Sequence, residues 1–240
     1  MWWTLMFACG HRLALEAELT RTRAELATVR AELERRQAEV AGLAGDVEAC
    51  AGGAAEADLR SLLALARSQR ATGDIPGAIA AFQEVETKDP KGTDGMSARR
   101  ALSELKIVGR PAPVVGVHQW IQGSQPAPGT IQVVLFFEAW CPHCQLSTPE
   151  MQQVQERWAD RGLTVVGYTS LSKGGTVEDT RQFLDRVKAY FPVAVEDGSG
   201  TDAYVVTGIP AVAVVKDGVV VYRGHPAEIN DALLTTLSSR

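Results

Sequence analysis

Two cysteines separated by two residues, Cys141 and Cys144, are the side chains best suited to chemistry in this sequence. They lie in the run Trp140–Cys144, which follows an apolar strand-like segment and opens a helical pattern. A cysteine at the start of a helix lies near unpaired backbone N–H groups and the helix dipole, and both lower a thiol pKa. The thiolate is the nucleophile in disulfide exchange, and a second cysteine one turn on can resolve the mixed disulfide. We therefore predict that Cys141 attacks and Cys144 resolves.

Four further residues bear on this dithiol. Pro142 and His143 separate the two cysteines, and the imidazole of His143 adds a dipole or partial positive charge near the sulfur. Such a charge favours the reduced thiolate form and makes the pair more oxidising. Farther along, Ile209 and Pro210 precede another buried strand, where a proline cannot continue a sheet ladder and its peptide bond can be cis. That proline could present the backbone of Ile209 to an extended substrate segment.

Alternative roles for the two cysteines are an inert disulfide or half of a zinc site. A zinc site needs a second ligand pair, and the remaining cysteines and histidines have no suitable spacing (Cys9, Cys50, His11, His118 and His225). We therefore expect no metal and no cofactor, and we take His118 and His225 as ordinary surface or edge histidines.

Composition narrows the function classes. The 240 residues are 45% hydrophobic and 22% charged, as in a folded protein of one or two domains. The net charge of -5 argues against nucleic-acid binding. No run approaches 18 consecutive apolar residues, so the sequence as given predicts no membrane-spanning helix.

The last 130 or so residues have the pattern of an α/β domain, with a boundary at 109–113, where two prolines follow a glycine. Asp217-Gly218 signals a tight hairpin, so the sheet is mixed and ends in an antiparallel pair. We predict strands at 131–137, 163–168, 211–215 and 219–222, and helices at 144–160, 177–189 and 228–237.

The domain 110–240 resembles the thioredoxin family, in the TlpA/ResA-like branch of the cell envelope. The resemblance rests on the WCxxC motif after a strand, on Pro149 in the following helix, on Tyr204 and Gly208-Ile209-Pro210, on Lys216-Asp217-Gly218 and Gly224, and on the Pro-Ala-Pro entry. It implies a thioredoxin-like sheet flanked by helices, with Pro210 lying against the dithiol and shaping substrate binding. It also fits an inserted strand and helix around 176–190.

Two departures from the family pattern matter. Leu135 stands where thioredoxin has a buried carboxylate under the dithiol, so another group or water must take the proton of Cys144. Glu138 is the nearest acid in sequence, and its alternative role is that of a solvated surface residue. The Pro-His pair between the cysteines is more similar to disulfide-forming oxidases than to envelope reductases, which leaves the direction of electron flow open.

Residues 11–51 predict a coiled coil. With position a at Leu19, Leu26, Leu33, Val40 and Val47, eight of the ten core sites are apolar. A parallel pair would oppose Glu18 to Arg23 and Glu25 to Arg30, so we expect a parallel homodimer. The alternative is a single helix packed on the rest of the chain, because Thr22 and Arg36 weaken the core. Cys50 falls at a d position and could form an interchain disulfide; its alternative is an inert residue at a helix end before Gly52 and Gly53.

Residues 57–107 predict a short helical unit. The turn glycine Gly73, then Ala78, Phe82 and the closing Pro90, resemble one tetratricopeptide repeat, followed by an amphipathic helix near 97–105. A lone repeat does not build the family's concave peptide groove, so we expect a spacer or dimerisation aid rather than a peptide-binding site.

Residues 1–10 are apolar but lack a preceding Lys or Arg, so they fail as a complete signal peptide. They can be read as the remnant of an export signal, with Cys9 at a loose lipoprotein cleavage pattern. We therefore expect attachment in the cell envelope or periplasm, with a cytoplasmic protein as the alternative.

These features together predict a membrane-tethered thiol-disulfide oxidoreductase. Its partners would be cysteine-containing protein substrates and a redox partner protein. The alternative is a dimeric adaptor in which the thioredoxin fold only positions or binds a partner; loss of function in Cys141→Ser would favour the enzyme.

Overall fold

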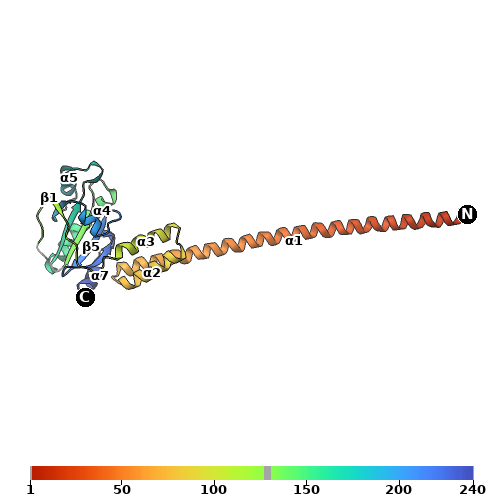
Figure 1. Cartoon of the computed structure of the whole chain (residues 1–240), viewed down its shortest axis with the longest axis horizontal. Helices are drawn as coiled ribbons and strands as arrows, with labels where there is room; N and C mark the ends of the chain where they lie inside the picture. Colours follow the sequence, from red (N-terminus) through yellow and green to blue (C-terminus); the bar gives the residue numbers. More distant parts are fainter. Residues whose placement is uncertain (1, 127–130, 240) are drawn as a thin grey trace. The chain divides into compact units, whose positions relative to one another are not determined.

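The computed structural model describes residues 2–126 and 131–239. Within the first helix, the side chains of residues 2–15, 17, 46–52 and 54 lie outside the description. The chain divides into two units, Met1–Ala57 and Asp58–Arg240, and each is described by itself. Figure 1 shows the chain coloured along the sequence, with labels on α1–α5, α7, β1 and β5.

The first unit is helical throughout its described part, because it belongs to α1 (Trp2–Ala71). We expected residue 51 to end the stalk, but α1 continues through Gly52 and Gly53. A glycine costs a helix only about 1 kcal/mol relative to alanine, and here alanines and a glutamate follow the pair. The predicted roles of Cys9 and Cys50 concern side chains outside the described residues.

The second unit begins with three consecutive helical segments, namely the end of α1, then α2 (Ile75–Lys88) and α3 (Thr93–Leu105). Gly73 turns the chain with a φ of 83°, which favours glycine. Asp74 then caps α2 by accepting a hydrogen bond from the N–H of Gly77 at 3.1 Å. Ala78 and Phe82 are buried in the seam, as their spacing predicted. The last helix begins four residues before the predicted 97–105.

A six-stranded mixed sheet forms the rest of the unit, in the order β1-β4-β3-β2-β5-β6. Strands β4, β3 and β2 are parallel neighbours, whereas β1, β5 and β6 pair antiparallel. The strands are β1 (Val117–Gln122), β2 (Ile131–Phe136), β3 (Leu163–Thr169), β4 (Val193–Glu196), β5 (Ala211–Lys216) and β6 (Val219–Gly224). The predicted hairpin at Asp217-Gly218 is confirmed, and it joins β5 to β6.

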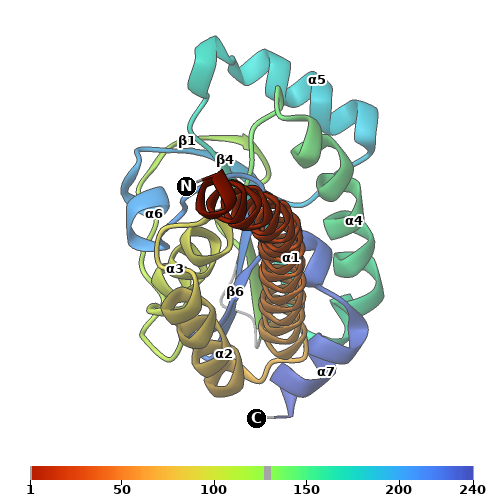
Figure 2. The same ribbon diagram turned by 90° about the vertical axis from the view of Figure 1, so that its right-hand side faces the viewer.

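Helices cover both faces of this sheet. Apolar residues of α4 (Pro142–Trp158), α5 (Val177–Val187) and α7 (Asp231–Ser238) share one core with the inward side chains of the strands. The opposite face is covered by the short α6 (Ser199–Ala203) with Tyr204, and by the chain that enters β1. Figure 2 shows α4 and α7 on one side and α6 on the other. The region 176–190 contains α5 but no strand; the additional strand is β4.

Among the described residues, none of the helices combines the length and the apolar character that crossing a membrane requires.

Candidate active site

The dithiol is placed by the junction between β2 and α4. Cys141 occupies the N-cap position of α4, and Pro142 takes the first helical position, where its missing N–H costs nothing. The N–H of Cys141 donates to the carbonyl of Glu138 at 3.1 Å, and its carbonyl accepts from the N–H of Gln145 at 3.0 Å. Both thiols are free. The side chain of Cys141 is 5% exposed and that of Cys144 is fully buried, so only Cys141 can meet a substrate directly.

A loop distant in sequence completes the surroundings of Cys141. The peptide bond between Ile209 and Pro210 is cis. The thiol of Cys141 lies 3.9 Å from the carbonyl oxygen of Ile209 and donates a hydrogen bond to it. The fold therefore brings together the two segments that the sequence left apart, and it places a backbone acceptor beside the nucleophile.

Burial controls the proton of Cys144. Desolvation raises the pKa of the Cys144 thiol far above its ordinary value, because the buried thiolate would lose its hydration. The backbone of Glu138 opposes this effect, whereas the neighbouring sulfur of Cys141 and the charge of Glu138 raise the pKa further. The resolving step therefore requires help to remove this proton.

Glu138 lies two residues after the end of β2 and is only 3% exposed, so the solvated surface role considered for it is wrong. Its carboxylate accepts hydrogen bonds from the hydroxyl of Thr169 at 3.0 Å, from the N–H and hydroxyl of Ser170 at 3.1 and 2.9 Å, and from the N–H of Ser172 at 3.2 Å. Through these hydrogen bonds, Glu138 holds the loop after β3 close to the segment that carries the dithiol. Leu135 is fully buried in the core.

Trp140 and His143 lie on the accessible side of the site. The indole of Trp140 is 37% exposed, and the ammonium of Lys173 lies 3.8 Å from its ring centroid. Such a cation over an aromatic face restrains both side chains. His143 is exposed in the first turn of α4, beside the dithiol in sequence.

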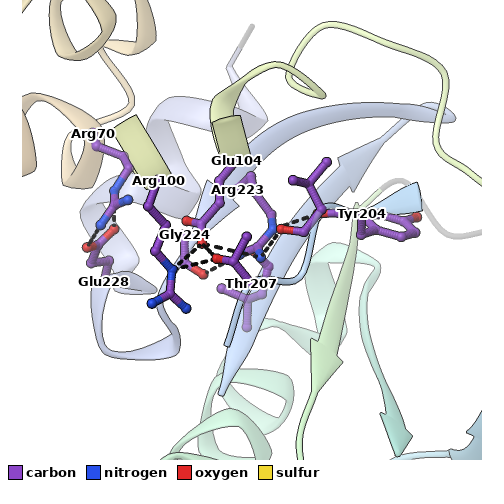
Figure 3. A network of polar contacts seen from close by, with 10 residues as sticks. Arg70, Arg100, Glu104, Tyr204, Thr207, Arg223, Gly224 and Glu228 are labelled. Carbon is purple, nitrogen blue, oxygen red and sulfur yellow. Dashed lines mark hydrogen bonds and ion pairs between the residues drawn. The ribbon is translucent and has the colours of Figure 1, made fainter. Parts of the chain in front are cut away.

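A buried arginine that sequence reasoning missed supports the loop that faces Cys141. Arg223 of β6 is 1% exposed. It donates hydrogen bonds to the carbonyls of Tyr204 at 3.0 Å, Val205 at 3.1 Å, Val212 at 3.4 Å and Gly224 at 2.9 Å. Figure 3 shows Arg223 beside Tyr204 and Gly224. A lone arginine in a strand pattern carries no signal for this role, because its burial depends on the long-range packing of α3 and α6.

Helix α3 reaches the same loop. Arg100 donates through Nε to the hydroxyl of Thr207 at 2.6 Å, and that hydroxyl donates to Glu104 at 2.6 Å (Figure 3). A second contact joins the end of α1 to the domain, since Arg70 makes two hydrogen bonds to Glu228 at 3.0 and 2.5 Å. The helical segments are therefore built into the surroundings of the loop.

No cluster of three metal-ligating side chains occurs in residues 2–126 and 131–239 with described positions. His225 accepts a hydrogen bond from the N–H of Ala227 at 3.1 Å through Nδ1. Burial lowers the pKa of His225, and the nearby positive charge of Arg70 lowers it further, while Glu228 opposes them. His118 is exposed in β1, far along the chain from the dithiol.

The sequence profile of the Redoxin family matches residues 121–237. The matched residues contain both cysteines, Glu138, Arg223 and the loop at Ile209, so the whole site except for α3 and the end of α1 lies within the match.

Known proteins similar to this chain carry related descriptions. The protein FixW of Rhizobium leguminosarum is 27% identical over 81 residues, which are 32% of this chain and 37% of that protein. The thioredoxin-like protein YneN of Bacillus subtilis is 26% identical over 102 residues, which are 42% and 59% of the two chains. The chain thus spans less than two thirds of either relative.

Among solved structures, a thiol-disulfide isomerase from Corynebacterium glutamicum is 21% identical, with a TM-score of 0.47. The match covers 55% of this chain and 95% of that structure.

Proposed function

We propose that this protein is a thiol-disulfide oxidoreductase that exchanges disulfides with protein substrates through Cys141 and Cys144. The observation that carries the proposal is the position of Cys141. Its sulfur lies at the N-terminus of α4, with a backbone acceptor of the cis-proline loop 3.9 Å away and a buried second thiol one turn on. A nucleophile that keeps a small exposed surface beside a fully buried resolving thiol is what disulfide exchange needs.

The first step of the reaction is an attack by the Cys141 thiolate on one sulfur of a substrate disulfide. A bond forms between Cys141 and that sulfur, the substrate S–S bond breaks, and the second substrate sulfur leaves as a thiolate that takes a proton. Helix α4 stabilises the attacking anion through its unpaired N–H groups and its dipole.

In the second step Cys144 loses its proton and attacks the sulfur of Cys141. The mixed disulfide breaks, the first substrate sulfur leaves and is protonated, and Cys141 and Cys144 become a disulfide. The substrate has then gained two electrons that the dithiol has lost. If the protein acts as a reductant, a partner protein with a dithiol must then reduce the disulfide between Cys141 and Cys144. If it acts as an oxidant, both steps run in reverse, and a partner protein with a disulfide must then reoxidise Cys141 and Cys144.

Trapping the intermediate tests this proposal. In Cys144→Ser the mixed disulfide cannot be resolved, so a disulfide-containing substrate such as insulin should remain attached to Cys141 and appear as a shifted band on a non-reducing gel. The matched variant Cys141→Ser should give no such band. Equally strong shifted bands from both variants would contradict the proposal. So would the absence of any shifted band together with a wild-type protein that does not reduce the substrate.

We further propose that the first unit forms a parallel homodimer. Six large apolar side chains of α1 at heptad spacing are between 52% and 68% exposed, namely Leu19, Leu26, Val29, Leu33, Val40 and Leu43. A second copy would cover this stripe and oppose Glu18 to Arg23. Thr22 is suited to such a seam, because its hydroxyl donates to the carbonyl of Glu18 at 2.9 Å.

Oligomeric state tests the homodimer. Lysine at the core positions Leu26 and Leu33 should convert a dimer to a monomer in analytical ultracentrifugation. Lysine at the outward positions Ala24 and Ala31 is the matched control and should leave the dimer intact. If oxidised protein also shows a covalent dimer that Cys50→Ser removes, the helices are parallel and in register; a covalent dimer surviving that change would exclude the Cys50 bridge.

The same stripe favours the second candidate function, a dimeric adaptor. In that case the redox pair is dispensable, and Cys141→Ser would retain cellular function while the Leu26 and Leu33 changes would abolish it. If the protein is an oxidoreductase, Cys141→Ser should instead abolish cellular function.

We place the substrates in the cell envelope and propose Cys9 as the point of lipid attachment. The basis is the apolar segment before Cys9 and the resemblance of the domain to an envelope branch. Incorporation of labelled fatty acid into the wild type but not into Cys9→Ser would support this attachment, and equal labelling would contradict it.

A further inference from the structure

A cavity of about 300 Å³ adjoins the loop that faces Cys141. One wall is formed by the loop residues Gly208, Ile209 and Pro210. The other walls come from the end of α1, from α2 and α3, and from β6, with Leu63 and Phe82 as apolar parts of the lining. The helical segments thus enclose a space that opens beside the backbone next to the nucleophile.

Guanidinium groups dominate the charge of this cavity. Four arginines line it, namely Arg67, Arg70, Arg100 and Arg223. Only two carboxylates accompany them: Glu104 lies 3.6 Å from Arg100 and 3.9 Å from Arg223, and Glu228 pairs with Arg70. Arg67 is exposed and forms no ion pair with any residue in the described ranges. The cavity therefore carries an excess of positive charge, although the protein as a whole is acidic.

Arg100 connects this charge to the loop. Its Nε donates to Thr207, and a Cβ atom built on Gly208 would lie 2.2 Å from its Nη2 atom. The guanidinium therefore lies against the bare backbone of Gly208, one residue before Ile209. Any larger residue at position 208 would displace the guanidinium of Arg100. Figure 3 shows Arg100 and Thr207 together beside the chain of Arg223.

We propose that this cavity binds an acidic side chain of the substrate, close in sequence to the substrate cysteine that reacts with Cys141. A carboxylate matches a guanidinium in shape and charge and can accept two parallel hydrogen bonds from it. A substrate segment that pairs with the backbone of Ile209 advances about 3.3 Å per residue, so a neighbour of its cysteine reaches Arg100 within a few residues. The inference rests on the proposed oxidoreductase function and names its substrate class: extended segments with acidic residues near the cysteine.

Binding of two matched peptides to the full chain tests this proposal. Both carry serine in place of the reacting cysteine; one has glutamates on either side of it and the other has glutamines. We expect the acidic peptide to bind about tenfold more tightly in fluorescence anisotropy at low salt, as hydrogen bonds to charged groups of this kind give. The preference should decline as sodium chloride is raised.

Charge reversal locates the site. In Arg67→Glu the preference for the acidic peptide should disappear, and Arg100→Gln should reduce it severalfold. Arg110→Glu makes the same change of charge at an exposed residue outside the cavity, and it should retain the full preference. Equal binding of both peptides by the wild type, or an unchanged preference in both cavity variants, would overturn the proposal.

The reaction with disulfide forms of the same peptides separates this proposal from the proposed function. If both peptides are reduced equally fast and bind equally well, the oxidoreductase function is supported and the proposed binding of acidic segments is overturned. Failure to reduce either peptide overturns the oxidoreductase, while the anisotropy ratio still decides whether the cavity selects acidic segments. Faster reduction of the acidic peptide in the wild type, but not in Arg67→Glu, supports both.

Discussion

The carbonyl oxygen of Ile209 lies 3.9 Å from the sulfur of Cys141, although 68 residues separate them in the chain. The contact depends on the loop before β5, because Ile209 directly precedes Pro210 and that strand. Arg223 lies behind this loop and donates hydrogen bonds to four backbone carbonyls, those of Tyr204, Val205, Val212 and Gly224. The nucleophile is therefore placed by α4, and the surface on which a substrate would lie is placed by a buried cation.

Replacement of Arg223 by methionine should destabilise the protein and disorder the substrate loop. The change keeps side-chain volume but leaves the carbonyls of Tyr204 and Val205 without donors in a buried place. Each buried polar group left unpaired costs about 1 to 3 kcal/mol, so we expect about 3 kcal/mol less free energy of unfolding in urea. The exposed Arg181→Met on α5 is the control and should change stability by less than about 0.5 kcal/mol. A small effect at Arg223 would mean that water replaces its contacts.

Several features of this site could be predicted from sequence, because local patterns determine them. The apolar run before Cys141 and the helical pattern after it correctly predicted the strand and helix that hold the dithiol. The edge strand β1 was missed because half of its residues are polar and most are at least partly exposed, and β4 was missed because it has only four residues.

The remaining features could not be predicted from the sequence, because they depend on packing between distant segments. The alternation of side chains along β2 could not predict which way the Glu138 side chain points, because this residue lies beyond the end of that strand. The groups that donate hydrogen bonds to it belong to the end of β3 and the loop after it. Arg223 gives no sequence signal, since its partners are backbone carbonyls of a distant loop. The cavity likewise combines residues from α1, α3 and the loop, which no single segment reveals.

The stability of the reduced protein should fall at alkaline pH because of Cys144. Burial raises the pKa of its thiol above the ordinary value of 9.0, so the folded protein retains a proton that the unfolded chain releases above that pH. The unfolded state then binds fewer protons than the folded state, and stability falls by about 1.4 kcal/mol per pH unit above 9. Urea denaturation of reduced wild type and reduced Cys144→Ala at pH 8 and pH 10 measures this loss, since other titrations are common to both. A difference between them that does not change with pH would show that Cys144 titrates alike in both states.

Substitution of Glu138 by glutamine should separate two opposite effects of this acid on resolution. Its negative charge raises the pKa of Cys144, which slows attack, whereas a carboxylate that accepts the proton of Cys144 would speed it. Because four N–H and O–H groups already donate to the carboxylate, we expect the charge effect to dominate and resolution to be faster in Glu138→Gln at neutral pH.

Rapid mixing of the purified mixed disulfide measures the resolving rate directly. The matched control is Glu156→Gln, which removes an equal charge from the end of α4 away from the dithiol. Resolution that becomes about 100-fold slower in Glu138→Gln, but not in the control, would instead assign the proton acceptor to Glu138.

The reduction potential of the dithiol should depend on His143. This side chain is exposed in the first turn of α4, where positive charge or a dipole stabilises the thiolate of Cys141 and with it the reduced form. His143→Ala should therefore lower the potential, by about 20 to 30 mV for a contribution near 1 kcal/mol. Equilibration of the full chain in glutathione buffers measures the potentials of wild type and His143→Ala, and His118→Ala, an exposed histidine of β1, should leave the wild-type potential unchanged. The wild-type potential itself fixes the direction of electron flow: a value near about -270 mV makes the protein a reductant, and one near about -120 mV makes it an oxidant. Identical potentials for wild type and His143→Ala would mean that α4 and the burial of Cys144 set the redox balance without the histidine.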